Sequence, residues 1–95
     1  MGGRLMKFGK HTAFMIEFIS DFVNGEIERL FFDLDYSHYV IKHFPYMENE
    51  NERIARKFAD TIDVAYERWT DTDISDEAFR EKISVALKEW LQGQT

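Results

Sequence analysis

The stretch from Asp60 to Glu77, DTIDVAYERWTDTDISDE, marks where one predicted helix ends and the next begins. Apolar residues keep the helical spacing as far as Trp69, TDTD interrupts it, and Ser75 stands at an N-cap position before the next apolar run. The stretch also contains seven carboxylates and a single cation, Arg68, which gives it a formal charge of −6. Because the net charge of the whole chain is also −6, the other residues balance to zero. Both the helix pattern and the charge are therefore organised around this segment.

Amphipathic helices are predicted on both sides of this segment. The upstream helix begins around residues 49–52 and reaches Trp69, and the downstream helix runs from Ser75 to Gly93, where glycine favours a left-handed stop. The inner residues of these two helices are Ile54, Ala55, Phe58, Ile62, Ala65, Tyr66, Trp69, Phe79, Ile83, Ala86, Leu87 and Trp90.

Two further helices are predicted nearer the N-terminus. The first is capped by Thr12 and runs to about Asn24, with Gly25 as its stop. Its apolar face consists of Phe14, Met15, Phe18, Ile19 and Phe22. The second starts near Glu26 and ends before Pro45, because a residue that precedes proline is pushed out of the α region. Its predicted inner face is Ile27, Leu30, Phe31, Leu34, His38 and Ile41, and a second apolar flank consists of Phe32, Tyr36, Tyr39 and Val40.

Four helices with short joins predict an all-α fold, specifically an antiparallel four-helix bundle. Residues 1–10 are predicted to be a flexible leader, residues 11–93 a single helical domain, and residues 94–95 a tail. Nine Phe, four Tyr and two Trp supply large apolar surfaces for one core.

Composition and charge narrow the function classes. The chain has no cysteine, which fits a reducing compartment, and it lacks an apolar run of the length of a membrane span, so we expect a cytoplasmic protein without a membrane partner. A net charge of −6 disfavours direct binding of nucleic acid, because phosphate contacts need a basic surface. The expected partner is a cationic protein.

Catalytic and metal-binding patterns are nearly absent from the sequence. No P-loop, dinucleotide glycine motif, GxSxG or HExxH occurs. Asp35 with His38 resembles half of a di-metal bundle site, but such a site needs a second acid-x-x-His step, which the chain lacks. We therefore expect a protein that is not an enzyme and that needs no cofactor or metal.

Five carboxylates of the central stretch have no predicted local partner. They are Asp60, Asp63, Glu67, Asp71 and Asp73. The first three recur at steps of three and four, which predicts one carboxylate edge on the upstream helix, and the last two lie in the connector. Asp76 and Glu77 are instead explained by the first turn of the last helix, where negative charge is favoured. A solvated surface that serves only solubility is the competing interpretation of the five.

Four segments, taken together, resemble a known family. They are FMIEFISDFVNGEI (14–27), RLFFDLDYSHYV (29–40), ARKFADTIDVAYERW (55–69) and DISDEAFREKISVALKEWL (73–91). In their order and residue classes they are similar to the small helical immunity proteins of the colicin D immunity type, the bacterial self-protective colicin-like group. The resemblance covers roughly residues 13–91.

The resemblance implies an immunity protein that stays in the producing cell and binds the C-terminal nuclease domain of a cognate toxin, often a tRNase. Its acidic surface would cover the cationic cleft that holds RNA phosphates, and the free protein would be a monomer. The residues that the resemblance places in this role are Asp60, Asp63, Glu67, Asp71 and Asp73, with Tyr66 as an adjacent contact and Asp33, Asp35 and Tyr36 as further candidates.

A non-catalytic adaptor or homodimerisation module is the alternative function. The aromatic density of the second helix departs from the family pattern and indicates either a different toxin class or a self-association face. The self-association face would then consist of Phe32, Tyr36, Tyr39 and Val40. A concentration-independent dimer that Tyr39→Glu abolishes would favour this alternative, and a stable monomer would favour the immunity protein.

Overall fold

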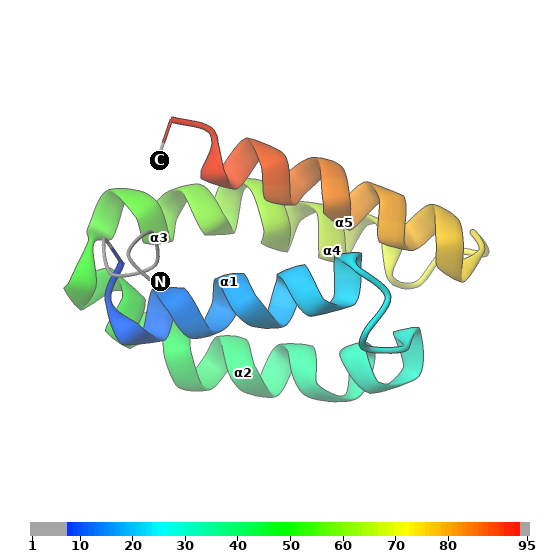
Figure 1. The fold of residues 1–95 in the computed structure, drawn as a ribbon, viewed down its shortest axis with the longest axis horizontal. Helices are drawn as coiled ribbons and strands as arrows, with labels where there is room; N and C mark the ends of the chain where they lie inside the picture. The colour runs from blue at the N-terminus through cyan, green and yellow to red at the C-terminus, as the bar shows by residue number, and fades with distance from the viewer. Residues whose placement is uncertain (1–7, 94–95) are drawn as a thin grey trace.

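Helices account for most of residues 8–93, which are the residues that the computed structural model describes. They are α1 (Lys10–Val23), α2 (Arg29–Glu50), α3 (Glu52–Phe58), the π-helix η2 (Ala59–Asp63), α4 (Val64–Trp69) and α5 (Asp76–Leu91). α3, η2 and α4 follow one another without a break and form one rod, called the third rod below (Figure 1). No strand occurs in these residues, so the prediction of an all-α fold is confirmed.

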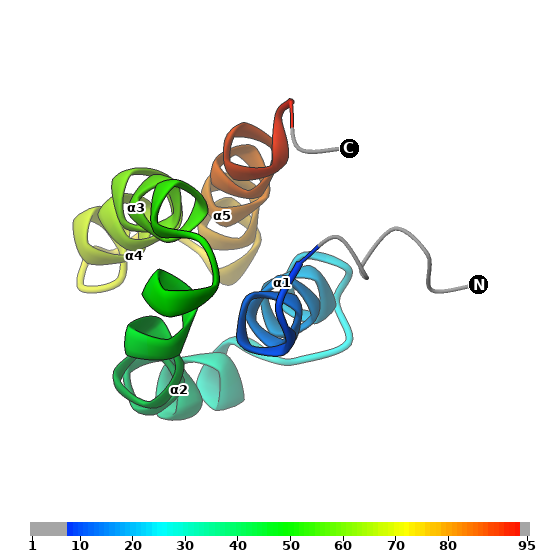
Figure 2. The same cartoon turned by 90° about the vertical axis from the view of Figure 1, so that its left-hand side faces the viewer.

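The four rods surround one core. α1 packs against α2 and α5, and the third rod also packs against these two helices. Figure 1 shows successive rods reversing direction across the view, and Figure 2 shows them nearly end-on around the shared interior. The completely buried apolar side chains are Met15, Ile19, Phe22, Phe32, Met47, Ala55, Ile62, Phe79, Ile83 and Trp90. None of the described helices is long and apolar enough to cross a membrane.

Three helix ends lie where the sequence signals place them. Gly25 follows α1 and Gly93 follows α5, and both have the left-handed φ values, 84° and 80°, that glycine adopts easily. Ser75 caps α5, because its hydroxyl accepts a hydrogen bond from the Ala78 N–H at 3.0 Å. These predictions are confirmed.

The start of α1 differs from its prediction. The helix begins at Lys10 after Gly9, so Thr12 already lies inside it. The Thr12 hydroxyl instead donates to Glu50 at 2.7 Å, and Glu50, from the far end of α2, supplies the cap. Of the predicted leader, residues 1–7 lie outside the described residues, as does the predicted tail at 94–95, whereas Phe8 packs against the core.

The face of α2 that packs against the core is the one predicted as its second apolar flank, and the predicted inner face points outward. The exposed residues are Leu30, Phe31, Leu34, His38 and Ile41, and the buried ones are Phe32, Tyr36, His43 and Met47. The ring of Phe32 stacks on Phe22 and Phe18 of α1, with centroid distances of 4.0 and 5.1 Å. The Phe32 ring thus fills the space between α2 and α1. Of the self-association face predicted on this flank, Phe32 and Tyr36 are buried, and Tyr39 and Val40 are partly buried against the core.

α2 also continues through Pro45, where it was predicted to end, and reaches Glu50. Proline lacks the N–H that would bond to the carbonyl four residues earlier, and a helix bends at such a position. Figure 2 shows the last turns of α2 leaving the line of its first turns and rising toward α3. Met47 is completely buried and anchors these turns. The continuation brings Glu50 to the start of α1.

The third rod contains a π-helix where a regular α-helix was predicted. Within η2, the Thr61 hydroxyl donates to the Lys57 carbonyl at 2.6 Å, and side-chain bonds of this kind compete with the regular backbone ladder. Ile62 remains completely buried, on the side where η2 packs against α5. A π-turn changes the helical register between the residues before it and the residues after it.

Candidate functional site

Four of the five predicted carboxylates are exposed. Asp60 lies in η2, Glu67 in α4, and Asp71 and Asp73 in the turn that leads to α5. Within residues 8–93 none of the four forms an ion pair; the cations of the three ion pairs found there bond to other carboxylates. These side chains leave negative charge without a neutralising partner along the third rod and the turn after it.

Asp63 is the exception, because it has a partner inside the protein. Tyr36 of α2 donates its hydroxyl to Asp63 Oδ1 at 2.8 Å, and Tyr36 is only 2% exposed. Burial, and then the Asp63 carboxylate, raise the pKa of Tyr36, so the hydroxyl stays protonated and continues to donate. The prediction that Asp63 lacks a local partner is wrong, and Tyr36 is too buried to serve as a contact for a partner protein.

A second tyrosine–aspartate pair lies beside the first. Tyr66 of α4 donates its hydroxyl to Asp33 Oδ1 at 3.1 Å, and its ring stacks on Tyr36 with a centroid distance of 3.8 Å. Burial raises the pKa of Tyr66. Arg29 also donates to Asp33, at 3.1 Å, which neutralises that carboxylate. The two pairs fasten α2 to the third rod, so Asp33 and Asp63 act mainly in the scaffold.

Asp35 lies apart from these pairs. It lines a surface hollow at the beginning of α2 together with Glu26, Ile27, Glu28 and Phe31. The nine predicted site residues therefore do not form one surface. Exposed acids follow the third rod and its turn, the tyrosine–aspartate pairs lie between helices, and Asp35 belongs to another acidic group.

The acids of the third rod occupy two adjoining strips instead of one edge. Asp63 and Glu67 line a hollow with Val64 and Arg68. Asp60 lines the next hollow, which Val64 and Arg68 also border. The π-helix separates the registers of Asp60 and Glu67, and the regular spacing assumed for the sequence did not include it.

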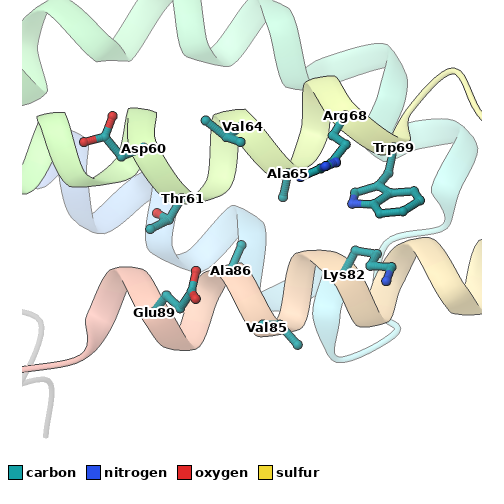
Figure 3. A pocket seen from close by; sticks show the side chains of 10 residues that line it. All are labelled: Asp60, Thr61, Val64, Ala65, Arg68, Trp69, Lys82, Val85, Ala86 and Glu89. Carbon is teal, nitrogen blue, oxygen red and sulfur yellow. The ribbon is translucent and has the colours of Figure 1, made fainter.

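The hollow beside Asp60 lies between the third rod and α5 and has a volume of about 320 Å³. Figure 3 shows its charged side chains at opposite ends, with Asp60 and Glu89 at one end and Arg68 and Lys82 at the other. Between these ends lie Val64, Ala65, Val85 and Ala86. Lys82 Nζ is 4.5 Å from the centroid of the Trp69 ring, a cation–π contact that holds this cation beside the tryptophan. The hollow can thus receive an apolar side chain of a partner protein, and a cationic side chain next to it in that partner would reach Asp60.

A polar cluster that the sequence analysis missed joins the start of α1 to the end of α2. Glu50 accepts hydrogen bonds from the backbone N–H groups of His11 and Thr12 at 2.8 and 2.9 Å. The Nδ1 atoms of His11 and His43 are 2.8 Å apart, so one ring donates and the other accepts. Glu50 places a negative charge at the positive end of the α1 dipole.

The protonation states of this cluster follow from its surroundings. Burial lowers the pKa of His43, and the nearby His11 and Lys42 lower it further. For Glu50, burial raises the pKa, but the hydrogen bonds from His11 and Thr12 outweigh burial and lower the pKa overall. The close approach also requires Gly9, because a Cβ at this position would overlap Glu50. His11 and His43 are 32 residues apart, and no spacing rule connects them.

Neither a metal-ligand group nor a known relative identifies the chemistry. Among residues 8–93 there is no group of three or more His, Cys, Asp or Glu placed to hold a metal ion, and His38 points from the exposed side of α2. Comparisons with protein-family models, with curated proteins and with solved structures find no match for the chain.

Proposed function

We propose that this chain is an immunity protein, an antiparallel four-helix bundle that inhibits a cognate bacterial toxin nuclease in the cytoplasm of the producing cell. The partner is the basic C-terminal nuclease domain of the toxin, an RNase or tRNase, and the bundle covers its active-site cleft. The protein performs no catalysis and needs no cofactor. The observation that carries the proposal is a group of four exposed carboxylates without an ion-pair partner in residues 8–93: Asp60 and Glu67 on adjoining strips of the third rod, and Asp71 and Asp73 in the turn after it.

Charge placement supports this function over a surface that serves only solubility. The four carboxylates follow the third rod and the turn after it, and in residues 8–93 they have no ion-pair partner. A cleft that binds RNA presents several cations at the spacing of phosphates. Carboxylates concentrated along one rod and the turn after it attract such a cleft and speed its association, whereas scattered charge would keep the protein equally soluble.

The surroundings of the carboxylates add apolar contact area. Val64 and Val85 are about half exposed, at 53% and 48%, and both border the hollow between the third rod and α5. Binding energy in interfaces comes mostly from a few apolar or aromatic anchors, and peripheral charges act mainly on association rate. We expect the hollow to hold an apolar anchor of the nuclease, while the acids meet its cations. The tyrosine–aspartate pairs keep the third rod fixed against α2.

The proposal is tested with the basic C-terminal domain of the protein encoded by the upstream neighbouring reading frame. Association with that domain is measured by interferometry at low and at physiological salt, for the wild-type chain and for the double variant Asp60→Lys with Glu67→Lys. We expect the variant to associate at least about tenfold more slowly at low salt, because both changes reverse the local field. The same variant should protect RNA from cleavage by the domain less well than the wild type.

A matched control keeps the total charge change the same. Glu17 of α1 and Glu48 of α2 are exposed, and Glu17→Lys with Glu48→Lys should slow association much less. Circular dichroism should give the same helix content for all three proteins. Equal slowing by the two double variants would overturn the assignment to the third rod. Failure of the wild-type chain to bind the domain or to protect RNA would overturn the proposed function.

A further inference from the structure

The outward face of α2 exposes several large apolar side chains that do not pack in the core. This face consists of Leu30, Phe31, Leu34, His38 and Ile41. Its four apolar side chains are between 53% and 76% exposed, with Ile41 the most exposed. They recur at helical spacing, so they form a continuous stripe opposite the buried side of α2. A continuous stripe of this kind indicates an interaction surface, whereas scattered single residues would not.

The size of the stripe suits a contact between two folded proteins. Four large apolar side chains that are more than half exposed present on the order of 400 Å². Pairing two such stripes buries about twice this area, and the flanking side chains bring the total to roughly 1,000 Å², the lower range of specific protein interfaces. Burial of this apolar area is the driving force for association.

The two ends of the outward face carry opposite charge. At the beginning of α2, an acidic hollow is formed by Glu26, Ile27, Glu28, Phe31 and Asp35. Toward the other end, Lys42 follows Ile41 and is exposed. Within residues 8–93 neither the three carboxylates of the hollow nor Lys42 takes part in an ion pair. The face therefore complements a copy of itself that runs in the opposite direction.

We propose that two copies of this chain associate through the outward faces of their α2 helices, antiparallel and related by a twofold axis. The midpoint of the stripe lies between Leu34 and His38. An axis there brings Ile41 of each copy against Leu30 of the other, and Lys42 beside the acidic hollow of the other. A twofold axis between antiparallel helices brings the same side of each helix together. Lys42 lies on the side of α2 that also carries Phe31 and Asp35, so it faces the acidic hollow of the other copy. Each contact thus occurs twice.

This dimer replaces the expected free monomer and uses other residues than the predicted self-association face. It is independent of the proposed nuclease inhibition, since the acids of the third rod lie outside the outward face. A basic partner alone would match the acidic hollow but would meet Lys42 unfavourably. A second copy satisfies both ends at once, and this is why we choose it as the occupant.

The first test is the mass of the full-length chain by sedimentation equilibrium. We expect a reversible dimer for the wild type, and for Leu34→Asp a dissociation constant raised by about a hundredfold or more, because the carboxylate would be buried at the centre of the pair. The helix content of Leu34→Asp should not change, since Leu34 is 66% exposed in the single chain. A monomeric wild type at the highest attainable concentration overturns the proposal, and so does a dimer that Leu34→Asp leaves intact.

The charged ends allow a test of the antiparallel direction. Lys42→Glu should weaken the dimer about tenfold, because it places a carboxylate beside the acidic hollow. Adding Glu26→Lys and Glu28→Lys to the same chain restores opposite charges across the pair and should recover most of the affinity. If the dimer did not bring these ends together, the two added substitutions would not restore its affinity. A triple variant that dimerises as weakly as Lys42→Glu therefore overturns the antiparallel geometry.

The absence of cysteine from the chain permits a direct probe of proximity. Leu34→Cys should form a disulfide-linked dimer under mild oxidation, because the two copies of position 34 lie close to the axis. Val85→Cys is the matched control, since Val85 is also an exposed apolar residue but lies on α5. We expect Leu34→Cys to cross-link at least about tenfold faster at equal concentration. Equal cross-linking rates for the two variants overturn the proposed axis.

Discussion

The two faces of α2 have similar composition and opposite surroundings. Phe31 and Phe32 are neighbours in sequence, yet Phe31 is 53% exposed and Phe32 is completely buried. His38 and His43 differ in the same way, since His38 is exposed and His43 stacks on Phe14 with a centroid distance of 4.3 Å. The helical period alone fits either face. The inward face is distinguished by the stacked rings and hydrogen-bond partners that other helices bring to it.

This difference separates two roles of one helix. On the inward side, Tyr36, His43 and Glu50 each bond to a residue of another rod, so a substitution there affects the fold. On the outward side, the side chains have few partners in the single chain, and a substitution there affects association. These two roles can therefore be tested by measuring the stability of paired variants, one on each face, at concentrations low enough that the chain is monomeric.

The largest difference is expected for the adjacent phenylalanines. Phe32→Ala removes a ring that stacks on Phe22 and Phe18 and leaves a cavity, which should lower the free energy of unfolding by about 3–5 kcal/mol. Phe31→Ala should lower it by less than about 1 kcal/mol, because its ring is already half in water. Urea unfolding followed by circular dichroism measures both values. Similar losses for the two variants would contradict the orientation of α2.

A smaller difference is expected for two glutamates near the end of α2. Glu50→Ala removes the acceptor for three hydrogen bonds from His11 and Thr12, and the unfolding free energy should fall by about 2 kcal/mol, as for the loss of a charged helix cap. Glu48 is exposed, so Glu48→Ala should change it by less than about 0.5 kcal/mol. Hydrogen exchange should show faster opening of the first turn of α1 only for Glu50→Ala. A stable first turn in that variant would exclude the capping role.

The smallest difference concerns the pH dependence of stability. The pKa of His43 is lowered from 6.5, first by burial and then by His11 and Lys42, so below about pH 6.5 the unfolded chain binds more protons at this position than the folded chain. Stability should therefore fall as the pH decreases from about 6.5. The lowered pKa of Glu50, whose usual value is 4.5, adds a further loss in the same direction at lower pH.

The contribution of His43 is isolated by a substitution that cannot be protonated. His43→Asn keeps a polar group near the position of Nδ1, and stability should depend less steeply on pH between about 6.5 and 5 than in the wild type. His38→Asn is the control on the outward face and should retain the slope of the wild type. Urea titrations at several pH values give both slopes. An unchanged slope in His43→Asn would show that this histidine does not couple folding to protonation.

Much of the fold could be predicted from local sequence signals. The spacing of apolar residues predicts the helices, and glycines at 25 and 93 with Ser75 mark three of their ends, because these signals act through the backbone of a few residues. The continuation of α2 through Pro45 could not be predicted this way. It depends on the burial of Met47 and on Glu50 bonding to α1, which are contacts between segments far apart in sequence.

The candidate site was predictable only in part, for the same reason. The exposure of Asp60, Glu67, Asp71 and Asp73 agrees with their excess of charge, since unpaired carboxylates rarely leave water. The bond between Tyr36 and Asp63 joins residues 27 positions apart, and spacing along one helix does not reveal it. Which face of α2 points inward is likewise decided by the side chains of α1 and of the third rod that pack against it.

The π-helix η2 allows the third rod to hold one extra residue without turning Glu67 to another direction. A wide turn of this kind holds one residue more than the α-helix that could replace it. Deleting one residue within 59–63 would replace the wide turn by a continuous α-helix and would leave the direction of Val64–Trp69 relative to Glu52–Phe58 nearly unchanged. Deleting one residue from Glu52–Phe58 instead would rotate the residues before the deletion by roughly 100° relative to those after it. In this rod, η2 is therefore the place where a change in length disturbs the position of Glu67 and the bond between Tyr66 and Asp33 least.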